Sequence, residues 1–375
     1  MGEVLYILGA GASAGRESSY PLDLRFSLES ATSVIPVVAQ MKDRLDYLSK
    51  KIFPSLDFRG TNSIFYSAEK LVNARLAIHE DLKWFGILLN RAPFVDILAE
   101  TLYSRSDEEF NRLKRILAIY IILEQTLNGV DLRYTTFLTT LFAHAKSTKE
   151  LPSNVKIFSW NYDYQVEEAL FEKRNQGSPN NFDILLKDSI ITRTELLRGN
   201  ENQDYTGFKV FKLNGSAESL ISPLDIGRRA SRFIKSSSPL FDEFTNQTRQ
   251  MRLSSIIQSV SEYYLDLIKN DIEPSINFAW DETSGKLIKK IEQMSFLDTV
   301  TDIYVIGYSF PLLNAKIDRA ILKRCKSNNI FIQCRDENYL EIKSRVDSIK
   351  RGEQSVNPKV GINDFFIPFH VLEDS

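Results

Sequence analysis

The sequence has 375 residues, and with roughly 150 residues in an average domain this length excludes a single small module. Hydrophobic residues make up 43% and charged residues 26% of the chain, so a core can be buried and a disordered chain is excluded. The 47 Lys and Arg nearly balance the 49 Asp and Glu. This balance provides no global basic field to hold a phosphate backbone, so we expect no direct nucleic-acid binding.

The cysteines and the first apolar run indicate a reducing compartment. Two cysteines, Cys325 and Cys334, are too few for a four-thiolate zinc ribbon or a disulfide framework. The first apolar run follows Glu3 and ends at glycines, so it lacks the basic leader and the length of an export signal. No apolar stretch reaches the length of about 18 residues that a membrane helix needs. We therefore predict a cytoplasmic protein without a membrane segment.

The predicted elements alternate between strands and helices. Residues 4–8 are a short apolar run, typical of a strand buried on both faces of a parallel sheet. From about residue 26 to 144, apolar residues recur at three- and four-residue steps, which predicts helices. Strand-like runs then return at residues 155–160, 208–213, 276–280, 303–306 and 330–334.

This order predicts an α/β fold: a Rossmann-like, doubly wound parallel sheet with helices on both faces and a large helical insertion. We expect a nucleotide-binding domain made of residues 1–30 and 150–375. Residues 31–149 are expected to form the helical insertion.

A glycine-rich turn follows the first strand, and it consists of Gly9, Ala10, Gly11, Ala12 and Ser13. Glycines allow positive φ and let backbone N–H groups approach a diphosphate, so the turn is a candidate nucleotide site. A purely structural turn is the alternative. The ordinary dinucleotide fingerprint fits the spacing, but Pro21 falls inside its expected helix and the run 34–38 is not followed by an acidic residue. A dehydrogenase is therefore disfavoured.

Three later strand-like runs also end in polar turns, which contain Asn161 and Asp163; Asn214, Gly215 and Ser216; and Gly307, Tyr308 and Ser309. Because parallel strands share one carboxyl edge, where open α/β sheets bind ligands, these turns are expected to line one site. Each turn alone has a structural alternative, such as Asn161 capping the next helix or a plain turn at 214–216. Together the four turns predict a nucleotide-binding rim.

In order and strand context, these turns resemble the motifs of the sirtuin-like superfamily, most closely its bacterial branch associated with defence against phages. The shared motifs are Gly-Ala-Gly-Ala-Ser at 9–13, Trp-Asn-Tyr-Asp at 160–163, Leu-Asn-Gly-Ser at 213–216 and Ile-Gly-Tyr-Ser-Phe-Pro at 306–311. The resemblance covers residues 1–30 and 150–335 but not the helical insertion. It implies that NAD+ is bound as a substrate, with its adenosine diphosphate near the first turn and its nicotinamide ribose near Asn161.

In this branch the usual activity is hydrolysis of NAD+ to nicotinamide and ADP-ribose. Asn161 is then expected to hydrogen-bond the ribose or the attacking water, and Asp163 to orient it. The zinc-bearing deacetylases of the superfamily carry four cysteines that this chain lacks, so deacetylation is disfavoured and no metal is expected.

One position departs from the family pattern. Where relatives carry a histidine base before the Gly-Ser pair, this chain has Asn214, and an amide cannot take up a proton at neutral pH. The three histidines, His79, His144 and His370, lie outside the matching motifs. Two interpretations stay open: an NAD+ glycohydrolase of antiphage defence, or a weakly active or inactive NAD+- or ADP-ribose-binding subunit that regulates a partner such as a HerA-type ATPase. A homo-oligomer is expected by analogy.

Overall fold

The computed structural model describes residues 2–14, 38–52, 65–92, 94–143, 152–174, 189–199, 205–217, 246–269, 274–350, 352–359 and 361–373. Pro21, residues 34–37 and His144, which entered the sequence analysis, lie outside the described residues. Val38, the last residue of the strand-like run 34–38, begins a helix instead.

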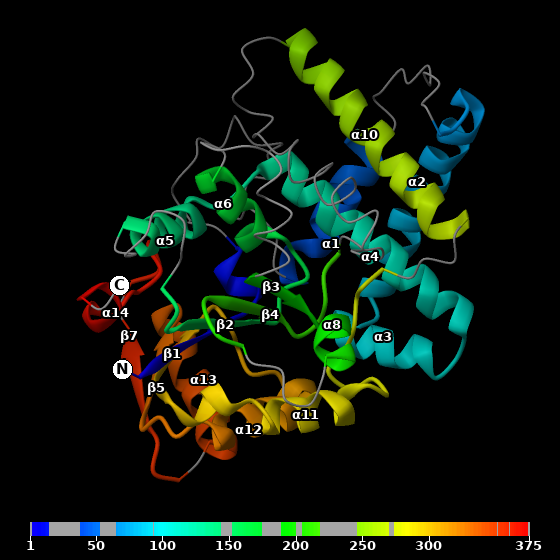
Figure 1. The fold of residues 1–375 in the computed structure, drawn as a ribbon. Helices are drawn as coiled ribbons and strands as arrows, with labels where there is room; N and C mark the ends of the chain where they lie inside the picture. Colours follow the sequence, from blue (N-terminus) through cyan, green and yellow to red (C-terminus); the bar gives the residue numbers. More distant parts are fainter. Residues whose placement is uncertain are drawn as a thin grey trace. The chain divides into compact units, whose positions relative to one another are not determined.

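The described residues contain a seven-stranded parallel sheet with the order β3-β4-β2-β1-β5-β6-β7 (Figure 1). Its strands are β1 (Glu3–Leu8), β2 (Val155–Ser159), β3 (Ile190–Thr192), β4 (Lys209–Lys212), β5 (Val300–Ile306), β6 (Asn329–Gln333) and β7 (Ser355–Lys359). Every neighbouring pair is parallel, so all carboxyl ends lie at one edge. The predicted Rossmann-like α/β fold is confirmed.

The central strand β1 lies between β2 and β5. The chain builds β2, β3 and β4 on one side of β1 and then crosses to build β5, β6 and β7 on the other side. The carboxyl ends of β1 and β5 therefore flank a topological switch point, the usual place for a ligand in an open α/β sheet.

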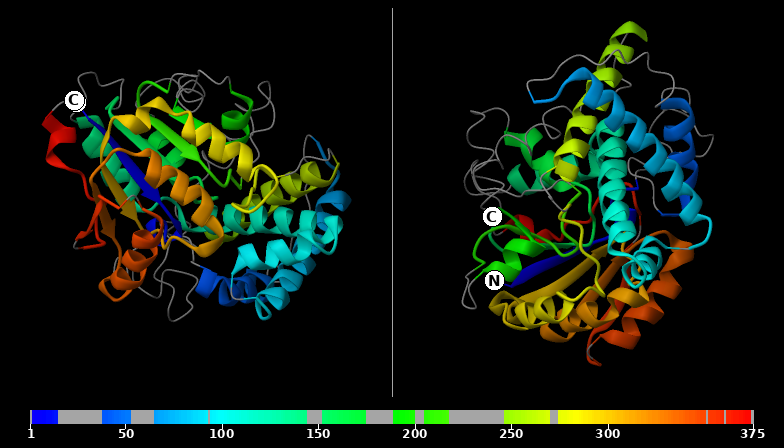
Figure 2. Two further views of the ribbon diagram at one scale, coloured as in Figure 1. Left: turned by 90° about the horizontal axis from the view of Figure 1, so that it is seen from below. Right: turned by 90° about the vertical axis from the view of Figure 1, so that its right-hand side faces the viewer.

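Helices cover both faces of the sheet (Figures 1 and 2). They are α5 (Leu132–Ala143), α6 (Gln165–Arg174), α8 (Arg193–Arg198), α11 (Ser284–Glu292), α12 (Ala315–Arg324), α13 (Asp336–Ile349) and α14 (Phe369–Glu373). Successive side chains of a strand point to opposite faces. Accordingly, Leu5 points to one face, where it belongs to the core cluster that includes Ile291 of α11 and Ile321 of α12. Tyr6 points to the other face, where its ring packs edge to face on the ring of Phe137 in α5, with 5.0 Å between the ring centroids.

The chain divides into two compact units, of which the first is Met1–Arg16, Asp131–Gly215 and Asn277–Ser375 and the second is Glu17–Val130 and Ser216–Ile276. These bounds differ from the expected ones in two places. Helix α5, which we assigned to the insertion, belongs to the sheet unit because Phe137 packs on the sheet. Residues 216–276, which we assigned to the sheet domain, belong to the helical unit because α10 (Asn246–Lys269) packs against its helices.

The described helices of the second unit are α1 (Val38–Tyr47), α2 (Ala68–Leu89), α3 (Val95–Tyr103), α4 (Asp107–Asn128) and α10, with a π-helical turn η2 (Leu48–Ile52) after α1. Serine side chains cap α2 and α4 at Ser67 and Ser106. Arg44 and Glu124 form a buried ion pair at 2.7 Å within this unit. No helix in the described part of the chain is long and apolar enough to cross a membrane.

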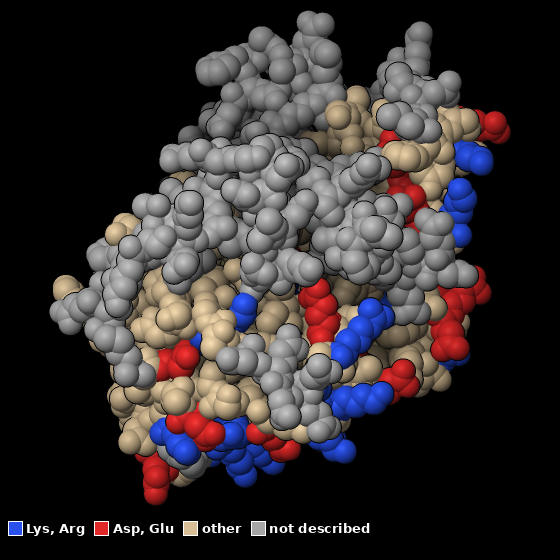
Figure 3. Space-filling view, in the orientation of Figure 1, with Lys and Arg blue, Asp and Glu red and all other residues tan. Residues whose placement is uncertain are grey.

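The strand expected at residues 276–280 is not formed. The backbone turns at this point because the carboxylate of Asp281 accepts the N–H of Phe278 at 3.1 Å, and the guanidinium of Arg193 binds the Phe278 carbonyl at 3.0 Å. Ile276, Phe278 and Ala279 of the run are buried, which explains its strand-like composition. On the face drawn in Figure 3, basic and acidic side chains are interspersed over the described residues.

Candidate functional site

Four of the sheet's turns begin side by side at its carboxyl edge. The N–H of Gly9 bonds to the carbonyl of Ile306 at 3.1 Å, which extends the pairing of β1 with β5 by one residue. On the other side, the N–H of Trp160 bonds to Leu8, and that of Leu213 bonds to Ser159, both at 2.9 Å. The polar residues that follow β1, β2, β4 and β5 are thus brought to one edge of one unit.

The glycine turn after β1 is a single 3-10 turn, η1 (Ala10–Ala12). Neither Gly9 nor Gly11 has positive φ, so this turn does not use the conformational freedom of its glycines. The glycines are required by close approach instead. A Cβ on Gly9 would lie 2.6 Å from the Cα of Tyr308, and one on Gly307, whose φ is +60°, would lie 2.1 Å from the nitrogen of Ala12. The turns after β1 and β5 therefore pack backbone against backbone.

The N–H groups of this turn already donate within the protein. Gly11 donates to Gly307 at 2.9 Å, Ala12 to Gly9 at 2.8 Å and Ser13 to Ala10 at 3.1 Å. Ala10 is exposed and Gly11 is half-exposed. A diphosphate at this turn would meet the exposed Ala10 first, and it would share donors that the turn uses itself.

Ser13 and Asn161 connect the first two turns. Ser13 is fully buried, and its Oγ accepts a hydrogen bond from Nδ2 of Asn161 at 3.0 Å. The same Oγ lies 2.9 Å from the hydroxyl of Tyr134 in α5. The carboxylate of Asp163, and not Asn161, contacts the start of α6, where it accepts the N–H of Gln165 at 3.2 Å. The alternative role of Asn161 as the cap of this helix is therefore not what the contacts show.

Asp163 is buried, and burial raises its pKa, while the nearby Lys212 ammonium and the Ser13 hydroxyl lower it. Lys212 is a fully buried cation that donates to the carbonyl of Asp163 and pairs with Oε1 of Glu167 at 3.3 Å. Burial also raises the pKa of Glu167, and Lys212 opposes that rise. Sequence reasoning missed Lys212 and Glu167; the only signal was a lysine at the end of β4, directly after the apolar pair Val210 and Phe211.

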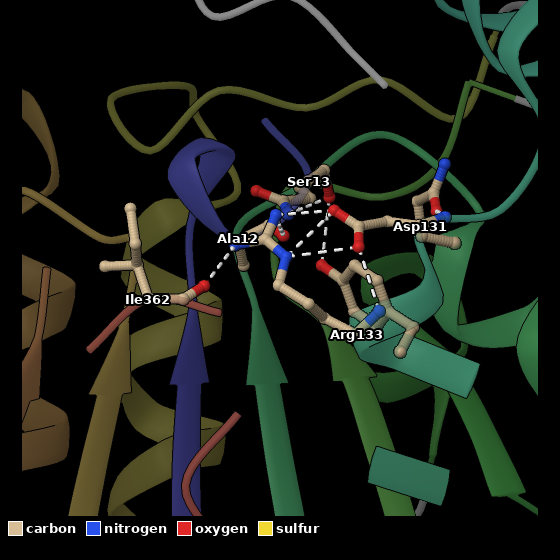
Figure 4. Close-up of polar contacts among 8 residues, drawn as sticks. Ala12, Ser13, Asp131, Arg133 and Ile362 are labelled. Atoms are coloured by element: carbon tan, nitrogen blue, oxygen red, sulfur yellow. Dashed lines mark hydrogen bonds and ion pairs between the residues drawn. The ribbon is translucent and has the colours of Figure 1, made fainter. Parts of the chain in front are cut away.

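A buried ion pair fixes the carbonyl side of the glycine turn (Figure 4). Arg133 donates to the carbonyl of Ala12 at 2.8 Å and to that of Ile362 at 3.3 Å, and it pairs with Asp131 at 2.5 Å. Both side chains of the pair are only 4% exposed. We did not predict these two residues as part of the site, because they lie in the stretch assigned to the insertion.

Asn214 faces the turn after β2. Its Nδ2 donates to the carbonyl of Trp160 at 3.2 Å, and its buried Oδ1 has no hydrogen-bond partner among the described residues. Gly215 has a φ of +78°, a conformation that favours glycine. Ser216 is buried, belongs to the second unit and donates its N–H to the carbonyl of Ser275 at 2.9 Å. Among Asn214, Gly215 and Ser216, Asn214 is thus the residue whose side chain contacts the turn after β2.

The turn after β5 has one side chain directed into the protein and one directed to solvent. The ring of Tyr308 is buried and stacks on Trp160, with 5.7 Å between ring centroids and 12° between ring planes. Ser309 is exposed, and its carbonyl accepts a hydrogen bond from Arg345 at 2.8 Å. Of the three residues that we predicted here to bind the ligand, Tyr308 is buried, Gly307 is half-buried against the glycine turn, and Ser309 is exposed.

His370 lies near the opposite end of β5, 3.6 Å from the carboxylate of Asp302. Within the described residues, no group of three or more His, Cys, Asp or Glu side chains is arranged to hold a metal ion. The sequence matches no protein-family model, and no curated protein is significantly similar to it.

Proposed function

We propose that this chain binds NAD+ at the carboxyl edge of its sheet and hydrolyses the nicotinamide–ribose bond, as an NADase of bacterial antiphage defence. The resemblance of the four turns motivates this function. One observation supports it: the hydrogen bond from Asn161 to Ser13 joins the two motifs to which the resemblance assigns the nicotinamide ribose and the diphosphate.

The chemistry needs little from the protein besides position and charge. Water and NAD+ give nicotinamide, ADP-ribose and one proton, and the leaving group departs as neutral nicotinamide, so no general acid is required. Positive charge develops on the ribose as the bond breaks. Asp163, two residues after Asn161, and Glu167 of α6 are buried carboxyls, which favour a cationic transition state when ionised, and Lys212 offsets part of their charge. In this scheme Asn161 orients the ribose or the water.

The alternative function is a subunit that binds NAD+ or ADP-ribose without turnover and acts through a partner such as a HerA-type ATPase. The observation that favours it is the side chain of Asn214. It stands where relatives carry a base, and its Nδ2 is already engaged by the carbonyl of Trp160. A hydrolase would then have to release the proton of water directly to solvent.

The test is to incubate the purified full chain with NAD+, alone and with the products of neighbouring genes, and to quantify released nicotinamide. The hydrolase is supported if wild type releases nicotinamide and Asn161→Ala does not. Asn338→Ala, a change at an exposed helix residue, is the control and should release nicotinamide as wild type does. Binding of NAD+ measured by calorimetry without release supports the binding subunit. Neither binding nor release, or full activity of Asn161→Ala, overturns the proposed site.

A second variant asks what Asn214 contributes. If a base was lost at this position, Asn214→His is expected to raise the rate of hydrolysis by about 10²-fold or more. An unchanged rate in a folded Asn214→His variant means that position 214 takes no part in the chemistry.

A further inference from the structure

Beneath the carboxyl edge, a buried polar cluster surrounds the hydroxyl of Tyr308. The hydroxyl donates to Oδ2 of Asp318 in α12 at 2.8 Å and accepts Nδ2 of Asn314 at 2.9 Å. Asn314 lies in the 3-10 turn η5 (Leu312–Asn314) just before α12. Asp318 is 1% exposed and Asn314 is 4% exposed. The phenol is therefore held from inside the protein and is not presented to solvent.

The ring of Tyr308 contacts the turns that follow two other strands. It stacks on Trp160, the residue directly before Asn161. It also lies so close to Gly9 that a Cβ there would come within 2.7 Å of the Tyr308 side chain. Through this one ring, the turns after β1, β2 and β5 are packed together.

The turn that carries Tyr308 is in an unfavourable backbone conformation. Gly307 has a φ of +60°, and Phe310 has a φ of +50°, which is rare for a bulky residue. The Phe310 ring is buried and lies 4.7 Å from the ring of Tyr308. With both rings directed inward, Ser309 between them is left exposed at the tip of the turn. A strained turn of this kind persists only when its anchors hold it.

Burial favours the neutral form of the Asp318 carboxyl. Burial raises its pKa well above the ordinary value, and the nearby Tyr308 hydroxyl and Trp160 indole lower it by less. Its second oxygen, Oδ1, is buried without a hydrogen-bond partner among the described residues. A neutral carboxyl needs no cation beside it, so the cluster fixes Tyr308 by hydrogen bonds and not by an ion pair.

We propose that Asp318 and Asn314 are positioning residues of the dinucleotide site: through the hydroxyl of Tyr308 they hold the strained turn 307–311 against Gly9 and Trp160, with Ser309 directed at the ligand. This role rests on the proposed function, because the ligand it serves is NAD+. Neither residue touches the ligand. They act by fixing the spacing of the three turns that enclose it.

The test compares three variants of the full chain. Tyr308→Phe and Asp318→Ala each remove the central hydrogen bond, and each is expected to raise the Kd or KM for NAD+ about five- to tenfold while changing kcat less than about threefold. Asp318→Asn offers the same neutral oxygen to the hydroxyl and is expected to restore affinity to within about threefold of wild type. The double variant Tyr308→Phe with Asp318→Ala should bind no more weakly than the weaker single variant, because both changes break one contact.

The matched control is Tyr339→Phe, which removes a partly buried hydroxyl bonded to the carbonyl of Val356 and leaves the three turns untouched. It should keep wild-type affinity. If Tyr308→Phe and Asp318→Ala lower stability but keep wild-type affinity, their role is merely structural and the proposal is overturned. Loss of affinity in Asp318→Asn equal to that in Asp318→Ala would overturn the neutral-acceptor role.

A readout without NAD+ separates this inference from the proposed function. In a variant whose other tryptophans, Trp84 and Trp280, are replaced by phenylalanine, acrylamide quenching of fluorescence reports access to Trp160, which is 4% exposed. Quenching should increase at least about twofold in Asp318→Ala and stay low in Asp318→Asn, because a displaced Tyr308 uncovers the indole. If wild type binds no NAD+ but shows this pattern, the proposed function fails and the positioning contact stands. Unchanged quenching in Asp318→Ala refutes the contact.

Discussion

Nδ2 of Asn161 donates to Oγ of Ser13 at 3.0 Å, across 148 positions of sequence. A planar amide that commits its nitrogen to one side directs its oxygen to the other, so this hydrogen bond fixes Oδ1 of Asn161 facing away from the glycine turn. Ser13 is itself held by the hydroxyl of Tyr134 at 2.9 Å. The orientation of the amide is thus set before any ligand arrives, which is the condition for catalysis by positioning.

The first prediction concerns Ser13. Ser13→Ala leaves the Nδ2 of Asn161 and the hydroxyl of Tyr134 buried without their shared partner. We expect the free energy of unfolding to fall by about 1–3 kcal/mol, because the groups that remain have lost water without regaining a hydrogen bond. Urea unfolding measures the loss. The exposed helix variant Ser348→Ala should change stability by less than about 0.5 kcal/mol, and equal effects of the two variants would contradict the prediction.

The second prediction tests why the turns carry glycine. Gly307→Ala forces a left-handed residue and places a Cβ 2.1 Å from the nitrogen of Ala12, so we expect a loss of about 2–4 kcal/mol in unfolding free energy. Gly285 lies in α11 with nothing within 4 Å of the position that a Cβ would take, and Gly285→Ala should stabilise by about 0.5–1 kcal/mol. Thermal melts of both variants test whether glycine is needed at position 307 for backbone packing or only for contact with the ligand. If Gly307→Ala melts at the wild-type temperature, backbone packing is refuted.

The sequence predicted the strands wherever an apolar run ended at a turn, as in β1, β2, β4, β5 and β6. It missed β3, which has three residues, and β7, an edge strand that contains Pro358 and is partly exposed. Neither shows the pattern of a buried strand, because a short or edge strand gains its pairing from the neighbour and not from its own composition. The prediction for residues 276–280 was wrong in the opposite way: the run has the apolar composition of a buried strand, but it leads into a turn.

The candidate site shows the same limit. Motif order and strand context predicted that Ser13, Asn161 and Asn214 approach one another, because parallel strands share a carboxyl edge. The charged side chains behind them, Lys212 and Arg133, were not predicted. Lys212 pairs with Glu167 of α6, and Arg133 reaches the carbonyl of Ala12, which is 121 positions away in the sequence. No local pattern encodes these contacts, and a buried charge is identified only by the partners that the fold supplies.

The third prediction concerns the ion pair of Arg133 with Asp131. Arg133→Met leaves the Asp131 carboxylate buried without its cation, and we expect a loss of about 3–5 kcal/mol in the free energy of unfolding. Adding Asp131→Asn should recover part of this loss, because the amide carries no charge and still accepts the N–H of residue 133. The matched control is Arg105→Met, from an exposed pair with Glu109, which should cost less than about 0.5 kcal/mol. A double variant less stable than Arg133→Met alone would refute this account.

The fourth prediction is a pH dependence set by Asp318. Its pKa is raised well above 3.8 in the folded protein by burial, and the groups that act on it, Tyr308 and Trp160, carry no charge at neutral pH. Between 3.8 and the raised pKa, the folded state therefore holds one proton more than the unfolded chain. Stability must fall as pH rises through this range, by about 1.4 kcal/mol per pH unit.

Comparison of wild type with Asp318→Asn isolates this contribution, because the other ionisable groups are common to both proteins. As pH rises above 3.8, urea unfolding should show wild type losing stability relative to the variant, with a limiting slope of about 1.4 kcal/mol per pH unit. Asp298 supplies the opposite sign: hydrogen bonding to Arg324 lowers its pKa to about 2, so its contribution is lost only as pH falls below 3.8. Asp298→Asn should therefore run parallel to wild type from pH 5 to pH 7. If Asp318→Asn also runs parallel, Asp318 is ionised in the folded protein, and the hydroxyl of Tyr308 is then held by a carboxylate and not by a neutral acid.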